Sequence, residues 1–135
     1  MVQIVHGLLV LEDGRIIFQR RTKDAKYNPG MLGFFGGHIE KDEPPSLALR
    51  RELQEETSLD VEELEFKPVS SYTISKDVLN TEDDRSFHLF RVEVPTEHFD
   101  VYEGDGAEAY TKAEALTQSD LIESVRYALE KIVKQ

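Results

Sequence analysis

Cysteine is absent from this 135-residue chain, and so is tryptophan. The missing thiols exclude disulfides, cysteine zinc sites, thiol nucleophiles and iron–sulfur ligation, and they fit a reducing compartment. No apolar run approaches the roughly 18 residues of a membrane-spanning helix, and the first residues lack the basic segment of a signal peptide. We therefore expect a cytoplasmic protein with no membrane partner.

Positive charge is also scarce, since 16 Lys and Arg face 27 Asp and Glu, a net charge of −11. Nucleic-acid binding depends on Lys and Arg contacts to phosphates, so we expect no nucleic-acid partner. A small anionic ligand stays compatible with this charge, because multivalent cations held by carboxylates reverse the local field.

The length fits one domain, residues 1–135, without repeats or linkers. Apolar and β-branched runs predict strands, and proline followed by helix-forming residues predicts a first helix from Pro44 to about Thr57. The expected strands cover residues 3–11, 16–20, 32–35, 64–75 with a bend at Pro68, and 86–94. Strands interleaved with substantial helices indicate an α/β or α+β layered domain.

A second helix is indicated near the C-terminal end by apolar residues at steps of one, three and four. They are Leu121, Ile122, Val125, Ala128, Leu129, Ile132 and Val133. Thr117 and Asp120 resemble a capping box and predict where this helix begins. We expect its apolar stripe to pack on the sheet.

Three carboxylates on the first helix, Glu52, Glu55 and Glu56, are spaced i, i+3 and i+4. They fall within an arc of about 100° and repel one another, and a bound cation would relieve this repulsion. Oxygen ligands of this kind suit Mg²⁺ or Mn²⁺. A solvated acidic face is the alternative, but Gly36 and Gly37 just upstream allow a ligand to approach the backbone closely.

These residues belong to a pattern that resembles the Nudix box: Gly37, five residues, Glu43, seven residues, then Arg51 to Leu59 as RELQEETSL. The box covers residues 37–59, and the order of the flanking strands is similar to a complete small, MutT-like Nudix domain. Ser58 departs from the pattern, which has glycine there. That glycine ends the helix, where a left-handed conformation is common, so we expect Ser58 either to cost about 1 kcal/mol in that conformation or to force another helix ending.

The resemblance implies an α/β/α sandwich with a mixed β-sheet between helices. It also implies hydrolysis of a nucleoside diphosphate linked to another moiety, with bound Mg²⁺ or Mn²⁺ as cofactor. By position, Glu52, Glu55 and Glu56 would be metal ligands together with the carbonyl of Gly36. Glu52 or Glu56 would also hold or deprotonate the attacking water, and these two alternatives stay open.

Further site residues follow from the same resemblance. Glu43 and Arg51 would be a pair that fixes the preceding loop to the helix. A glutamate in a later loop often completes the site in MutT-like members, and Glu103 and Glu108 compete for that role. We favour Glu103, because the neighbouring glycines suit a mobile loop.

Three residues near the expected cleft are candidates for substrate binding. Arg21 lies in a cluster of four cations and could contact phosphate, although ordinary surface charge explains it equally well. Gly37 and His38 would lie beside the substrate, and a solvent-facing histidine is the alternative for His38.

The leading functional hypothesis is a nucleoside triphosphate pyrophosphohydrolase that releases nucleoside monophosphate and pyrophosphate, with oxidised nucleotides among its conceivable substrates. An ADP-ribose or nucleotide-sugar pyrophosphatase is the alternative among enzymes. A nucleotide-sensing module without turnover is the alternative from another class, and the complete set of box carboxylates favours catalysis. The expected partner is a nucleotide, and the expected state is a monomer or a homodimer.

Overall fold

A seven-stranded mixed sheet forms the centre of the computed structural model, which describes residues 1–134. The strands are β1 (Val2–Val10), β2 (Ile16–Arg20), β3 (Leu32–Gly33), β4 (Phe35–His38), β5 (Lys67–Ile74), β6 (Arg85–Glu93) and β7 (Ala107–Tyr110). The helices are α1 (Pro45–Glu56), the 3₁₀ turn η1 (Val61–Glu63), α2 (Lys76–Leu79), α3 (Lys112–Leu116) and α4 (Glu123–Lys131). The sheet order is β3-β2-β1-β6-β5, with β4 beside β1 and β7 beside β2.

Strand β1 organises the sheet, because it pairs along its whole length with β6 in parallel. On its other side β1 pairs antiparallel with β4 near its start and with β2 near its end. In the first of these pairings Gly36 lies opposite His6. Gly36 has a φ of 139°, and a Cβ there would lie 2.1 Å from the Val5 carbonyl oxygen, so only glycine fits.

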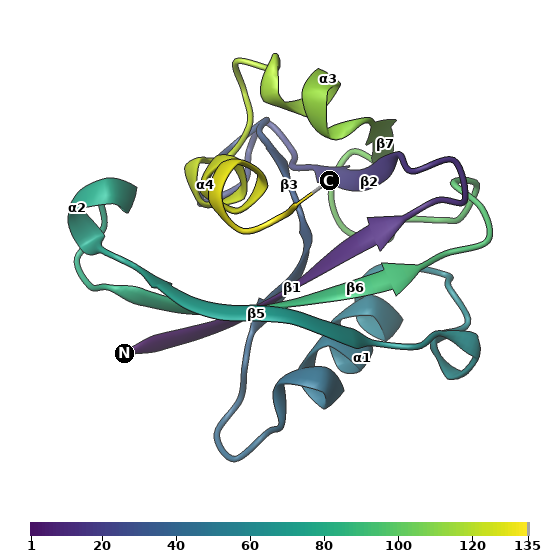
Figure 1. Cartoon of the computed structure of the whole chain (residues 1–135), viewed down its shortest axis with the longest axis horizontal. Coiled ribbons are helices and arrows are strands. Elements are labelled where there is room, and N and C mark those ends of the chain that lie inside the picture. The colour runs from purple at the N-terminus through teal and green to yellow at the C-terminus, as the bar shows by residue number, and fades with distance from the viewer. Residues whose placement is uncertain (135) are drawn as a thin grey trace.

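Helices cover both faces of the sheet: α1 lies on one face, and α3 and α4 lie on the other (Figure 1). The buried side chains accordingly form separate clusters. Phe34 belongs to the cluster on the α4 side, and Phe35 belongs to the cluster on the α1 side. The predicted fold class, a mixed sheet between helices, is confirmed.

The predicted start of the last helix is wrong. Helix α4 begins at Glu123 after Ile122, which makes no side-chain cap hydrogen bond. The backbone just before it pairs with β3 instead: Leu32 donates to the Asp120 carbonyl and its own carbonyl accepts from Ile122. Because these groups are used in the sheet, the helix begins later than the apolar stripe suggests.

The capping box is present one helix earlier, on α3. The Thr111 side chain accepts from the Glu114 backbone N–H, and the Glu114 side chain accepts from the Thr111 N–H. Thr117, the residue predicted to start α4, instead ends α3.

Other element boundaries differ in smaller ways. The predicted strand 32–35 is divided at Phe34 into β3 and β4, which pair with different neighbours. Strand β5 begins at Lys67, after η1, and its register shifts between Pro68 and Ser70 as the predicted bend requires. The short helices α2 and α3 were not predicted.

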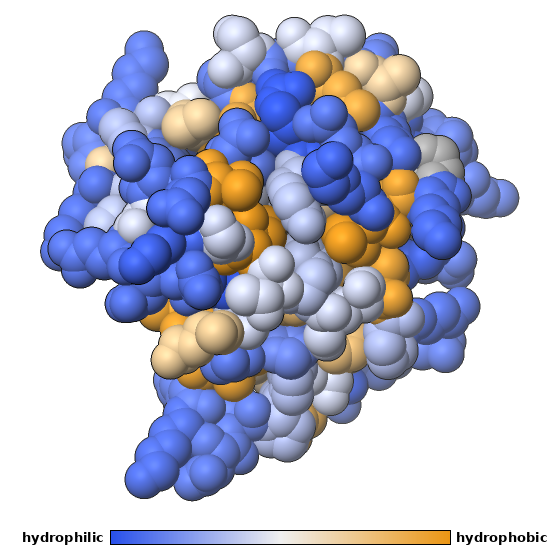
Figure 2. All heavy atoms as spheres, turned by 60° about the vertical axis from the view of Figure 1, so that its left-hand side comes forward, coloured by the Kyte–Doolittle hydropathy of each residue, from blue (hydrophilic) through white to orange (hydrophobic). Residues whose placement is uncertain are grey.

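Most of the molecular face in Figure 2 is hydrophilic, with apolar patches showing between the polar side chains. Within residues 1–134, no helix has the length and apolar character to cross a membrane.

Candidate active site

Helix α1 places one glutamate of the predicted cluster against the core. Its buried residues are Ala48, Leu49, Leu53 and Glu56. The first three pack beneath the sheet, and Glu56, which follows Leu53 by three residues, is only 3% exposed. A solvated acidic face does not have this arrangement, because a buried carboxylate needs a partner for its charge.

One oxygen of Glu56 has no such partner among the described residues, and the nearest polar group to the carboxyl is another glutamate, Glu52. The Oε1 atom of Glu56 is buried and makes no hydrogen bond. Burial raises the pKa of Glu56 to about 9, and the neighbouring carboxylates of Glu52, Glu103 and Glu55 contribute in the same direction. The ionised form of Glu56 is therefore unfavourable unless a cation binds beside it, and without a cation the carboxyl keeps its proton.

Arg51 connects the loop before α1 to the helix. Its guanidinium donates to both carboxylate oxygens of Glu43, at 2.8 and 3.0 Å, and to the His38 carbonyl at 3.1 Å. It also donates to Glu52 at 3.0 Å and lies 3.5 Å from Glu55. Glu43 and Glu52 raise the pKa of Arg51, and Arg51 holds the pKa of Glu43 below its usual range. The Glu43–Arg51 pair that the resemblance implies is present in the structure.

Strand β4, which carries Gly37, approaches the Glu52 side chain of α1 very closely. A Cβ on Gly37 would lie 2.7 Å from the Glu52 carboxyl carbon. Glycine at position 37 therefore leaves the space that the Glu52 carboxylate occupies.

The segment that carries Glu103 runs beside the C-terminal end of α1. The Tyr102 N–H donates to the Glu56 carbonyl at 2.7 Å, and Thr57 forms an antiparallel bridge with Val101. Glu103 comes next in the chain and is one of the charges that act on Glu56. The structure thus brings Glu103 to the box carboxylates.

Glu108 lies elsewhere. Its carboxylate accepts two hydrogen bonds from Arg20, at 2.6 and 2.8 Å, and one from the Tyr110 hydroxyl at 2.6 Å. These donors hold the pKa of Glu108 below its usual range. Of the two glutamates considered from the sequence, only Glu103 is close enough to influence Glu56.

The predicted substrate-binding residues Arg21 and His38 make contacts of another kind. Arg21 donates from Nε to the Tyr27 carbonyl at 2.7 Å, which holds the loop after β2. The His38 side chain is exposed, and its carbonyl accepts from Arg51. Their substrate contacts stay predictions.

Ser58 does not have a left-handed conformation, because the described non-glycine residues with positive φ are Asn28, Asp42 and Asn80. Thr57 ends α1 in an extended conformation, so the chain leaves the helix without a left-handed residue. Ser58 then binds the backbone of Asp100 twice: its N–H donates to the Asp100 carbonyl at 3.0 Å, and its Oγ accepts from the Asp100 N–H at 2.8 Å.

The donor types at this site fit a hard divalent cation. The buried Oε1 of Glu56 makes no hydrogen bond and is an oxygen ligand of the kind such ions prefer, and the carboxylates of Glu52, Glu55 and Glu103 act on the same group. Within residues 1–134, no three His, Asp or Glu side chains are arranged so that they could hold a metal ion. Arg51 contacts Glu52 and Glu55, so a metal ion bound by these carboxylates would have to compete with Arg51 and rearrange them.

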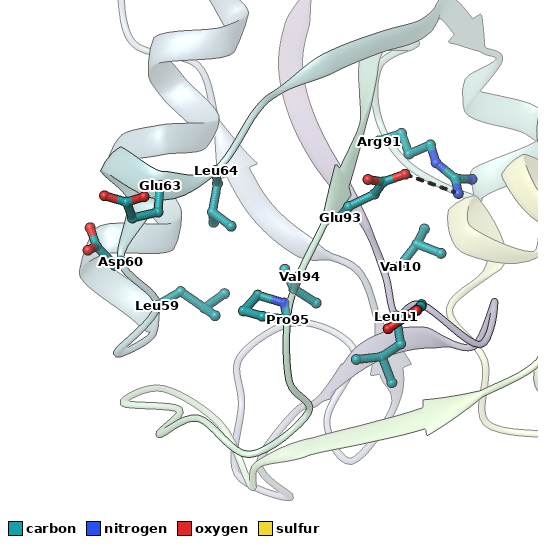
Figure 3. A pocket seen from close by; sticks show the side chains of 11 residues that line it. Val10, Leu11, Leu59, Asp60, Glu63, Leu64, Arg91, Glu93, Val94 and Pro95 are labelled. Atoms are coloured by element: carbon teal, nitrogen blue, oxygen red, sulfur yellow. Dashed lines mark ion pairs between the residues drawn. The ribbon is translucent and has the colours of Figure 1, made fainter.

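A cavity of about 700 Å³ lies apart from this cluster. Figure 3 shows Leu59, Leu64, Val94 and Pro95 directed towards it, with an ion pair between Arg91 and Glu93 at its edge. None of the box carboxylates lines this cavity.

Gln19 is a buried polar residue next to the site that was not predicted from the sequence. It is 8% exposed and donates from Nε2 to the Glu103 carbonyl at 2.6 Å. The signal was available, because an amide in the otherwise apolar strand Ile16–Phe18 needs a buried hydrogen-bonding partner.

The chain belongs to the NUDIX family, because the NUDIX domain matches residues 2–132. It is therefore a Nudix hydrolase, a family whose members are generally pyrophosphohydrolases. No curated protein matches the chain in sequence.

Solved structures with the same fold agree with this assignment. A MutT protein from Methanosarcina mazei has a TM-score of 0.80 and 19% identity, covering 97% of this chain and 91% of its own. The dihydroneopterin triphosphate pyrophosphohydrolase of E. coli has a TM-score of 0.74 and 19% identity, covering 97% and 94%. The NUDIX domain of NrtR from Shewanella oneidensis, solved with ADP ribose, has a TM-score of 0.73 and 14% identity, covering 96% and 84%.

Proposed function

We propose that this protein is a nucleoside triphosphate pyrophosphohydrolase that releases nucleoside monophosphate and pyrophosphate and depends on Mg²⁺ or Mn²⁺. The observation that carries the metal dependence is Glu56, a buried carboxylate with an unpartnered oxygen beside three further carboxylates. Keeping all of these groups ionised at neutral pH requires a cation.

Each box residue has a distinct part in this proposal. Glu52, Glu55 and Glu56 hold the ion together with the carbonyl of Gly36. Bound Mg²⁺ or Mn²⁺ supplies positive charge that neutralises the pyrophosphate oxygens in the transition state. Glu103 accepts the proton of the attacking water, with Glu52 and Glu56 as the alternatives for that step.

The remaining site residues orient the substrate and the loop. Arg51 and Glu43 fix the loop before α1, as their two hydrogen bonds indicate. Gly37 leaves room beside Glu52, and Arg21 and His38 contact the phosphates or the sugar from the adjoining loops. Arg21 would have to exchange its contact with the Tyr27 carbonyl to do so.

ADP-ribose is the second candidate substrate, since the structurally similar NrtR domain was solved with that ligand. A panel of ribo- and deoxyribonucleoside triphosphates, ADP-ribose and nucleotide sugars distinguishes the two when products are identified with Mg²⁺, with Mn²⁺ and in excess EDTA. Pyrophosphate released from a triphosphate supports the proposal. Exclusive cleavage of ADP-ribose would replace it with the second candidate.

The same assay with Glu56→Gln separates catalysis from a surface role. We expect kcat to fall by at least about a hundredfold, because the substitution removes a charged ligand that stabilises the transition state. Glu130→Gln is the matched control, since Glu130 is exposed on α4, outside the carboxylate cluster. A Glu56→Gln protein that keeps more than half of the control kcat would exclude Glu56 as a catalytic metal ligand.

A further inference from the structure

The segment Val101–Gly106 is attached to the rest of the protein on two sides. On one side, its start lies along the residues that follow α1, through the Thr57–Val101 bridge. On the other side, it lies over the end of β2, where the Arg20 carbonyl accepts from the Asp105 N–H at 2.7 Å and the Arg20 N–H donates to the Gly106 carbonyl at 3.0 Å. Glu103 is exposed between these attachments.

Two side chains, those of Ser58 and Gln19, add hydrogen bonds to these backbone attachments. On the α1 side, the Ser58 hydroxyl accepts at 2.8 Å from the N–H of Asp100, the residue immediately before the segment. Gln19 donates to the Glu103 carbonyl itself at 2.6 Å on the β2 side. Gln19 is only 8% exposed, so the packing around its side chain restricts the orientation of the amide that contacts the segment.

Gly104 makes the contact between Gln19 and the Glu103 carbonyl sterically possible. It has a φ of 94°, and a Cβ there would lie 2.6 Å from the Arg20 carbonyl and 3.3 Å from Gln19 Nε2. A glycine with positive φ therefore lets the chain turn directly over Gln19 immediately after Glu103.

We propose that Ser58 and Gln19 are positioning residues that hold the segment Val101–Gly106 so that the Glu103 carboxylate faces Glu56. The role of Glu103 rests on the proposed function, but the attachments are features of this chain. Ser58 stands where the Nudix box has glycine, so its hydroxyl contact is one that glycine at this position cannot make. Catalytic groups lose rate steeply when their supports are removed, because a displacement of about 1 Å can cost a hundredfold.

The first test measures backbone amide hydrogen exchange in the metal-free protein. Gln19→Met keeps the size of the side chain and removes its donor, and Ser58→Ala removes one hydroxyl from an exposed residue. We expect each variant to increase exchange by about tenfold relative to wild type at Tyr102 and Asp105, whose N–H groups donate to the Glu56 and Arg20 carbonyls. The matched control is Ser75→Ala, because the Ser75 hydroxyl likewise accepts backbone N–H groups, those of Asp77 and Val78, but at the start of α2.

The second test is a double-mutant comparison of turnover. We expect Gln19→Met and Ser58→Ala each to lower kcat by about fivefold to tenfold with little change in KM, and Ser75→Ala to leave both unchanged. In a Glu103→Gln background the same substitutions should have no further effect, since the residue that they position is already inactive.

Three results would overturn the proposal. The first is unchanged amide exchange in both variants, and the second is a loss of kcat that is equally large in the Glu103→Gln background. The third is full activity of Glu103→Gln itself, which would leave the hydrolase function standing if Glu56→Gln is inactive. If Gln19→Met does not fold, Ser58→Ala tests the same segment from its exposed side.

Discussion

Glu56 differs from the other carboxylates of α1 in its surroundings rather than in its chemistry. It is buried at 3% exposure beside the apolar residues of the helix, whereas Glu55 is exposed to solvent. Spacing within the helix groups these glutamates but does not distinguish them. The distinction arises because Leu53 and Glu56 share the face that packs beneath the sheet.

The raised pKa of Glu56 makes a prediction for the stability of the metal-free protein. In the unfolded chain this carboxyl has a pKa near 4.5, and in the folded protein burial and neighbouring carboxylates raise it to about 9. The folded state therefore binds the proton more tightly, so the stability contributed by Glu56 is complete below pH 4.5 and is lost as the pH rises towards 9.

Glu56→Gln removes this loss, because glutamine stays neutral. We expect the variant to be more stable than wild type at pH 8, by about 1 kcal/mol or more, and the difference to shrink towards pH 5. Urea unfolding in EDTA at both pH values measures it, with Glu130→Gln as the control. A difference that does not depend on pH would contradict the assignment of the raised pKa to Glu56.

Ser58 provides the second prediction at the scale of a residue. A left-handed Ser58 would make glycine stabilising at this position, but the observed hydroxyl contact to Asp100 reverses that expectation. Ser58→Gly loses one hydrogen bond and adds freedom to the unfolded chain, so we expect a loss of about 1 kcal/mol in unfolding free energy.

Ser58→Ala separates the two contributions to that loss, since alanine removes the hydroxyl without adding backbone freedom. It should be less destabilising than Ser58→Gly when both are measured by thermal unfolding at the same pH. A higher Tm for Ser58→Gly than for wild type would show that the hydroxyl contact contributes nothing to stability.

At the scale of elements, the sequence predicted those whose determinants are local. Helix α1 follows from its proline start and the helix-forming residues after it, and strand β2 follows from its run of apolar and β-branched residues. The start of α4 depends on a long-range contact, the pairing of Leu32 with Asp120 and Ile122, and no local signal reports that pairing.

The site residues also divide into those that local sequence predicts and those that depend on long-range contacts. The box carboxylates, Arg51 and Glu43 lie within one short stretch, so their spacing alone groups them. The position of Glu103 depends on bonds between residues far apart in the chain, such as Ser58 to Asp100, 42 residues apart. The contacts of Glu108 depend likewise on the register of β7 on β2, which places this residue opposite Phe18 and beside Arg20.

Helix α3 allows a prediction about helix capping. Thr111 has both hydrogen bonds of a capping box with Glu114, whereas the Thr117 hydroxyl only donates back to the Glu114 carbonyl. Thr111→Ala should therefore cost about 1 kcal/mol of unfolding free energy, and Thr117→Ala clearly less. Chemical denaturation of the two variants decides between them, and the opposite order would restore Thr117 as the more important cap.

At the scale of the whole molecule, the net charge of −11 favours the binding of cations and opposes the approach of an anionic substrate. The acidic cluster at the end of α1 concentrates this charge around a buried carboxylate. A divalent ion that binds there only in the folded state must raise the stability of the whole domain by mass action. Such an ion would offset the burial and the repulsion that raise the pKa of Glu56, so metal and proton would compete for this carboxylate.

Mg²⁺ should consequently raise the Tm of the wild-type protein, with an effect that grows with pH between 6 and 8 as Glu56 is more easily deprotonated. At a metal concentration one hundred times Kd the stabilisation is about 2.7 kcal/mol. Thermal unfolding with Mg²⁺ and with NaCl of equal ionic strength separates specific binding from screening.

Glu130→Gln should respond to Mg²⁺ as wild type does, and Glu56→Gln should lose most of the Tm increase. An equal Mg²⁺ response in Glu56→Gln would place the ion elsewhere on the acidic surface, and full turnover in excess EDTA would exclude a metal requirement altogether.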